Sequence, residues 1–166
     1  VVDINSFEFE KTITVSLNPN YIYSDSDGDV YVICMSDYSD DKSYIVQRID
    51  AKTDEVKTVE GIKAYKMTVA DDIAYIMFND YYANEVKYYK YDLKNEKLLS
   101  DNFITDGTVV SSPNGIGVDP VTGDIYVGKS NKKNNGDVYV FSSEGKLKSQ
   151  FETLPYPADF VFMTNK

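Results

Sequence analysis

The chain has 166 residues, with 17 Lys and Arg against 27 Asp and Glu, which gives a formal net charge of −10. Such an acidic chain has few cations to neutralise phosphates, so we expect neither nucleic acid nor an anionic membrane surface as a partner. Histidine is absent and Cys34 is the single cysteine. Histidine-based catalytic triads, His-Cys zinc sites and intrachain disulfides are therefore excluded.

Short alternating runs of Tyr, Val and Ile, separated by gaps rich in Asp, Asn, Gly and Ser, predict an all-β chain. No segment has helical periodicity. The apolar runs are too short to cross a bilayer, so we expect no transmembrane segment. In chain order, the predicted strands are 11–16, 21–24, 30–35, 44–50, 56–59, 65–70, 73–78, 86–92, 97–100, 115–119, 124–128, 137–142, 146–151 and 159–163.

Two of these hairpins share a sequence pattern. Residues 19–32 and 113–127 both read Pro-Asn-x-Ile-x-x-Asp followed by Gly-Asp-(Val/Ile)-Tyr-Val. Residues 65–76 repeat the order of strand, acidic turn and strand without the Pro-Asn or the Gly. The tyrosines common to the three copies, Tyr31, Tyr75 and Tyr126, are 44 and 51 residues apart. That repeat length, with four antiparallel strands in each unit, is typical of propeller blades.

The repeats predict blades over 19–60, 64–104 and 113–152, with 9–16 and 158–163 as strands of neighbouring blades. We interpret 1–166 as one partial β-propeller segment of about three and a half four-stranded antiparallel blades. Closed propellers have at least four blades, so we expect association with another copy or with the missing blades. Open end blades would expose aromatic faces that favour such association.

Packing between stacked blades accounts for much of the composition. Gly115 and Gly117 suit the crowded axis, and a core role explains most of the 15 tyrosines. Cys34 lies in an apolar strand, so we expect it to be buried.

The last repeat carries a family resemblance, through 112–127 (SPNGIGVDPVTGDIYV), 136–147 (GDVYVFSSEGKL) and 155–162 (PYPADFVF). These stretches resemble the YVTN-type, surface-layer-like propellers, especially the domain-of-unknown-function branch of secreted bacterial lipoproteins. The resemblance implies an extracytoplasmic location, in the periplasm or at the cell surface. It also implies a scaffold or binding role.

Two acidic clusters are interpreted as turns and loops. Residues 25–29 (DSDGD) have Gly at the fourth position, where an EF-hand loop has it at the sixth. A hairpin turn, with Asp and Gly at positive φ, explains this stretch. Residues 37–41 are predicted to form a solvated loop, and no metal site or cofactor is expected.

The loops between the second and third strands of the three blades should emerge on one rim of the propeller. Together they would form a surface lined by Asp, Asn and Tyr, suited to stacking on and hydrogen-bonding a glycan or a peptide. Ordinary polar loops remain the alternative interpretation. The candidate residues are Asp37, Tyr38, Asn79, Asp80, Tyr81, Tyr82 and Asn131.

Asn20 and Asn114 precede inner strands and are candidates for an axial pocket, although Asn after Pro is also a common turn element. A propeller lyase with a histidine acid/base is excluded by composition, and a quinoprotein is disfavoured because Trp is absent. A calcium-dependent, lactonase-like hydrolase would need acidic and amide ligands together at the axis. Asn20, Asn114, Asp25 and Asp119 could supply some of them.

The sequence thus favours a non-catalytic binding or scaffold module on an extracytoplasmic surface, with a glycan or a protein as the expected ligand of one rim. The alternatives are a lactonase-like enzyme and a purely structural subunit that completes a propeller ring.

Overall fold

The computed structural model confirms an all-β chain built from three antiparallel sheets of four strands each. The structure describes residues 1–36, 44–80, 85–131 and 133–163. Within these residues no helix has the length and apolar composition needed to cross a membrane. The strands are β1 (Pro19–Ser24), β2 (Val30–Cys34), β3 (Ile45–Ile49), β4 (Val56–Lys63), β5 (Lys66–Ala70), β6 (Ile73–Asp80), β7 (Glu85–Asp92), β8 (Lys97–Ser100), β9 (Pro113–Val118), β10 (Ile125–Asn131), β11 (Asn134–Phe141) and β12 (Leu147–Thr153).

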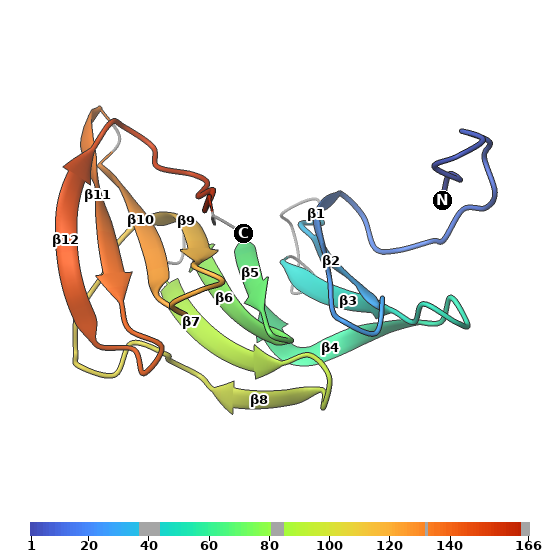
Figure 1. Cartoon of the computed structure of the whole chain (residues 1–166), viewed down its shortest axis with the longest axis horizontal. Coiled ribbons are helices and arrows are strands. Elements are labelled where there is room, and N and C mark those ends of the chain that lie inside the picture. The colour runs from blue at the N-terminus through green and yellow to red at the C-terminus, as the bar shows by residue number, and fades with distance from the viewer. Residues whose placement is uncertain (37–43, 81–84, 132, 164–166) are drawn as a thin grey trace.

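Each sheet is a blade whose strands follow one another in chain order, which we number blade 1 (β1–β4), blade 2 (β5–β8) and blade 3 (β9–β12). The blades stand side by side in an arc (Figure 1). The inner strands β1, β5 and β9 face its centre, and β4, β8 and β12 lie at the periphery. The arrangement is a partial β-propeller of about three blades.

The β1–β2 connection is the hairpin turn that the Asp-Gly pattern predicts. Ser24 pairs with Val30, and Gly28 has a φ of 89°. Asp25 accepts hydrogen bonds from the amides of Asp27 and Asp29, at 3.1 and 2.9 Å. The carboxylate therefore holds the turn.

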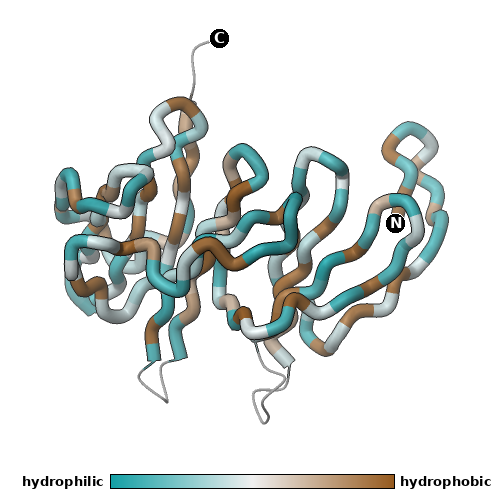
Figure 2. The backbone as a smooth tube through the Cα atoms, turned by 90° about the horizontal axis from the view of Figure 1, so that it is seen from below, coloured by the Kyte–Doolittle hydropathy of each residue, from teal (hydrophilic) through white to brown (hydrophobic). Residues whose placement is uncertain are grey.

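Successive side chains of a strand point to opposite faces of its blade, and in β2 and β6 residues of both faces are buried. Figure 2 shows hydrophobic residues along the strands of the blades. Tyr31 and Tyr75, equivalent residues of β2 and β6, lie on the face that packs against the following blade. The core between blades 1 and 2 contains Tyr31, Ile33, Val46, Met67, Ala74 and Ile76. The core between blades 2 and 3 contains Tyr75, Met77, Tyr88, Ile116, Val127 and Phe141.

Tyr126, the third equivalent tyrosine, lies on the face of blade 3 that points away from blade 2. Its ring contacts Phe160 and Phe162, with centroids 5.8 and 5.1 Å away. Residues 158–163 were predicted as a strand, but they form none. They pack against the sheet without joining its hydrogen-bonded ladder.

Residues 10–15, at the other end, are also extended without being a strand, contrary to the prediction for 9–16. The backbone amide of Ser16 donates to the side chain of Gln47 at 2.7 Å, so the segment is tied to blade 1 through a side chain. It forms no strand because its backbone has no ladder partner in the described chain. Cys34 is fully buried, as predicted.

Candidate functional site

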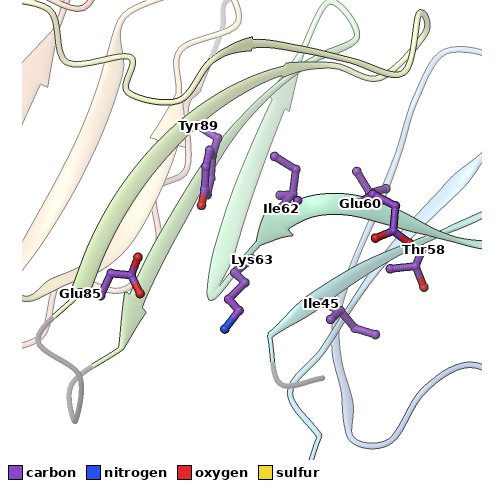
Figure 3. Close-up of a pocket in the computed structure, with 9 residues that line it drawn as sticks. Ile45, Thr58, Glu60, Ile62, Lys63, Glu85 and Tyr89 are labelled. Atoms are coloured by element: carbon purple, nitrogen blue, oxygen red, sulfur yellow. The ribbon is translucent and has the colours of Figure 1, made fainter. Parts of the chain in front are cut away.

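A cleft of about 370 Å³ opens between blades 1 and 2 (Figure 3). We call it the rim cleft. Its walls are residues 58–63 of β4, Ile45 at the start of β3, and Glu85 and Tyr89 of β7. Ile45 and Glu85 are the first residues of the strands that follow the β2–β3 and β6–β7 connections. The cleft therefore adjoins the rim on which the sequence predicts a binding surface.

A bulge in β4 produces the cleft. Ile45 pairs with Lys63 and Gln47 pairs with Thr58, so residues 59–62 stand opposite Val46 alone. Gly61 supplies the positive φ that the bulge requires, 75°, and an added Cβ there would meet no atom within 4 Å. The side chain of Ile62 turns inward, where it is 4% exposed and joins the core between blades 1 and 2.

The cleft combines an apolar floor with charges of both signs. Figure 3 shows the Tyr89 hydroxyl, the Lys63 ammonium group and the Glu85 carboxylate around the opening. Lys63 Nζ lies 5.8 Å from the centroid of the Phe78 ring, a cation–π contact that holds the ammonium group beside the cleft. Burial raises the pKa of Tyr89, with smaller contributions from Glu85 and Asp101, so its hydroxyl is a neutral donor.

Backbone groups add to this chemistry. β4 is the outer strand of blade 1, so one of its edges pairs with no strand of the described chain. An edge of this kind presents donors and acceptors to an extended ligand. The arrangement suits binding, because charged, apolar and backbone groups all line one open surface.

Of the seven rim residues predicted from the sequence, the structure describes three. Outside the described residues lie the other four, Asp37, Tyr38, Tyr81 and Tyr82. Asn79 Nδ2 donates to the carbonyl of Pro113 at 3.0 Å, which connects blade 2 to blade 3. Asp80 is the last residue of β6, on the same rim. Asn131 Nδ2 donates to the carbonyl of Asn135 at 2.8 Å and to the carboxylate of Asp137 at 3.1 Å, so it stabilises the β10–β11 hairpin.

The two asparagines predicted for an axial pocket make contacts within the fold. Asn20 is exposed, and its Nδ2 contacts Met35 Sδ at 3.4 Å. Asn114 Nδ2 donates to the carbonyl of Pro157 at 3.4 Å. Neither residue lines the rim cleft.

The candidate calcium ligands of the lactonase-like alternative lie at opposite ends of the inner strands β1 and β9. Asn20 lies at the start of β1, whereas Asp25 follows its end, about 16 Å further along an extended strand. Asp119 accepts hydrogen bonds from the amides of Val121 and Thr122, which holds its own turn. No group of three or more Cys, Asp and Glu side chains that could hold a metal ion occurs among the described residues.

The cleft itself is not among the features predicted from the sequence. Its one local signal is Gly61, a glycine inside an otherwise strand-like run, which is typical of a bulge. The approach of Tyr89 and Glu85 to β4 depends on how two blades pack, and no local pattern encodes it.

A second cavity, of about 330 Å³, lies on the other side of β7. It is lined by Val86, Tyr88 and the connection between blades 2 and 3, including Ile104 and Val110. Its lining is more apolar than that of the rim cleft, and it lacks charged side chains.

Comparison with known proteins identifies the fold. No family model matches the sequence, and no curated protein is similar to it. Solved structures are similar at the level of the fold. The gluconolactonase XC5397 from Xanthomonas campestris superimposes with a TM-score of 0.60 and 15% identity, covering 94% of this chain and 54% of that one.

Two further propellers are similar. The β-propeller domain of the Trilobed protease from Pyrococcus furiosus has a TM-score of 0.55 and 10% identity, with 86% of this chain and 45% of that one covered. The Dos1 propeller has a TM-score of 0.58 and 12% identity, with 85% and 38% covered. The chain thus spans about half the length of these structures or less. Likeness at such low identity establishes the β-propeller fold alone.

Proposed function

We propose that the protein is a non-catalytic binding or scaffold module whose rim cleft takes a short, extended peptide segment. The observation that carries the proposal is the bulge at Gly61, which opens β4 beside Tyr89 and Glu85. The edge of β4 offers backbone hydrogen bonds, and the apolar floor with flanking charges offers pockets for side chains.

A peptide fits this cleft better than a glycan does. Lys63 and Glu85 can pair with side chains of opposite charge, and Ile45 and Ile62 can cover an apolar one. Sugar rings stack on broad aromatic faces, and among the described residues Tyr89 is the one aromatic residue of the lining.

The resemblance to YVTN-type, surface-layer-like propellers supports an extracytoplasmic setting, in which such a module would display its rim to a protein partner. Cell fractionation of the source organism with an antibody to the chain checks this part. Recovery in the cytoplasmic fraction would contradict it.

Selection from a phage-displayed library of random peptides tests the cleft. Selected peptides are synthesised, and their affinity for the wild-type chain is measured by calorimetry. Because an anchor residue at the centre of a site contributes much of the binding energy, Tyr89→Ala should weaken binding at least about tenfold. Lys63→Ala should weaken peptides that carry an acidic residue.

Lys57→Ala is the matched control. Lys57 is an exposed lysine of the same strand, lies outside the cleft and pairs with Glu55 at 3.4 Å. Selected peptides that bind Tyr89→Ala as tightly as the wild type would overturn the proposal. So would a glycan array in which the cleft variants lose a sugar ligand while the library yields no peptide.

The lactonase-like alternative makes a different prediction. The wild-type chain, supplied with calcium, would hydrolyse gluconolactone faster than buffer does, and Asn114→Ala would abolish the difference. Such a result would overturn the non-catalytic assignment.

A further inference from the structure

The chain after β12 folds back across the outer face of blade 3. This C-terminal segment, residues 154–163, runs from the periphery toward the centre of the arc (Figure 1). It bonds to the sheet near its start, where the Gly136 amide donates to the carbonyl of Leu154 at 3.4 Å. The residues that it contacts are not part of the lining of the rim cleft, so the inference is independent of the function proposed for that cleft.

Four glycines form the surface beneath the segment, which we call the glycine face. Gly115 and Gly117 of β9, Gly128 of β10 and Gly136 of β11 lie on the same side of the sheet. A Cβ added to Gly115 would lie 2.5 Å from the carbonyl oxygen of Ala158. A Cβ on Gly117 would lie 2.7 Å from Phe160 Cβ, and one on Gly136 would lie 2.7 Å from Pro157 Cδ.

These four positions require glycine because a larger residue would not fit beneath the C-terminal segment. None of the four has a positive φ, so other residues could adopt their backbone conformations. Glycine in a strand interior weakens the strand unless another chain segment approaches closely. The glycine face is therefore a groove shaped for an extended chain, and Pro157, Ala158 and Phe160 fill it.

A buried lysine anchors the segment. Lys66 of β5 is 5% exposed, and its Nζ donates to the carbonyl of Ala158 at 2.7 Å and to Asp159 Oδ1 at 2.5 Å. The Tyr21 ring of blade 1 lies 5.1 Å from the same ammonium group. Lysine is almost never buried unless it is paired, so Asp159 supplies a counterion that the fold needs.

The hinge that leads into the groove is strained. Tyr156 has a φ of 60° between Pro155 and Pro157, and it is exposed. A non-glycine residue in this region costs free energy, and two prolines keep the hinge short and stiff. Short hinges under strain favour exchange of the following segment between copies, because the segment can make the same contacts in trans while the hinge relaxes.

We propose that the glycine face is a docking site for an extended Pro-Ala-Asp-Phe segment and that it accepts residues 157–160 of a second copy of this chain. Asp159 of one copy then pairs with Lys66 of the other, and the apolar residues beyond it, Val161 and Met163, follow into the interface. These two side chains are 89% and 96% exposed in the single chain.

Complementation between two defective full-length variants tests the proposal. In the first variant, Gly115→Val closes the groove and leaves the segment intact. In the second, Asp159→Ala with Phe160→Ala disables the segment and leaves the groove intact. Each variant alone should be monomeric. An equimolar mixture should give a heterodimer of about 38 kDa, twice the 18.8 kDa of one chain, in light scattering and native mass spectrometry.

Lys66→Met replaces Gly115→Val if the latter fails to fold, since it preserves the shape of the groove and removes the anchor. A mixture of two segment-disabled chains carrying different isotopic labels is the control, and it should stay monomeric. Absence of the heterodimer from mixtures of folded variants would overturn the proposal. A dimer in the control mixture would also overturn it, because the association would then not use the segment.

Discussion

Arg48 of β3 and Asp29, the residue before β2, form an ion pair inside blade 1 across 19 residues of sequence. Arg48 Nε donates to Asp29 Oδ2 at 2.9 Å, and the Ala51 amide donates to Oδ1 of the same carboxylate at 2.8 Å. Asp29 belongs to the Gly-Asp-x-Tyr-Val repeat, and its equivalent in blade 3, Asp124, pairs with Lys148 at 2.5 Å. The repeat thus has an electrostatic role: the acid before the second strand of a blade pairs with a cation from the third strand (Arg48 of β3) or the fourth (Lys148 of β12).

Arg48→Met should destabilise the chain by about 3 kcal/mol, because it leaves a buried carboxylate without its cation. The free energy of unfolding in urea measures the change. Lys11→Met is the control, since Lys11 and Asp54 form an exposed pair whose loss should cost less than about 1 kcal/mol. Equal losses for the two variants would contradict a structural role for the repeat aspartate.

Tyr88→Phe should cost about 1–2 kcal/mol of stability. The Tyr88 hydroxyl donates to the carbonyl of Val110 at 2.8 Å, and its removal leaves a buried acceptor unsatisfied. Tyr156→Phe, at an exposed tyrosine, should leave the urea midpoint unchanged. A Tyr88→Phe variant as stable as the wild type would show that Val110 finds another donor.

The chain should lose stability in alkaline solution. Burial raises the pKa of Tyr23 to about 12, and it also raises the pKa values of Tyr31 and Tyr88. Between the unfolded pKa near 10 and these higher folded values, the folded state holds more protons than the unfolded state. The free energy of unfolding must therefore fall as the pH rises through this window.

Urea titrations from about pH 9 to about pH 12, with phenolate absorbance recorded in parallel, test this expectation. A free energy of unfolding that stays constant across the window would contradict it.

Cys34 should resist thiol reagents in the native protein. It is fully buried, and burial raises the pKa of its thiol, so little thiolate is available. Reaction with a disulfide reagent should be at least about 100-fold slower than in denaturant, because it requires opening of the fold. Cys34→Ala supplies the blank, and equally fast native and denatured reactions would refute the predicted burial.

Gly61→Ala, compared with a control of equal cost in stability, tests whether peptide binding depends on the conformation of the β4 bulge. An alanine at a φ of 75° should cost about 1 kcal/mol, and it should reduce the affinity of peptides selected on the rim cleft. Gly107→Ala is a matched control: Gly107 has a φ of 81°, meets no atom within 4 Å and lies outside the cleft. It should carry the same cost in stability with no change in peptide affinity. Similar affinity losses in both variants would remove Gly61 from the site.

Much of the fold could be predicted from local sequence. The alternating runs and acidic turns predict repeated units of four antiparallel strands, which the structure has, and Tyr31, Tyr75 and Tyr126 lie on the second strand of their blades. These features depend on period and turn chemistry, which adjacent residues encode.

The remaining features depend on contacts that are distant in sequence. Lys66 stands in an alternating strand pattern, and its burial follows from Asp159, which is 93 residues away. Residues 158–163 alternate like a strand, but they lie on the glycine face without a ladder partner. Asn79, a candidate for the rim surface, connects blade 2 to blade 3 through its hydrogen bond to the Pro113 carbonyl, because β6 lies beside β9.

The most direct test of the proposed function is an amide chemical-shift map of the isotope-labelled chain titrated with a peptide selected from the library. The account predicts that the largest shifts fall on residues 59–63 of β4 and 85–89 of β7, the two walls of the rim cleft. Shifts confined to blade 3 or to the β1–β2 turn, with the two walls unchanged, would contradict it.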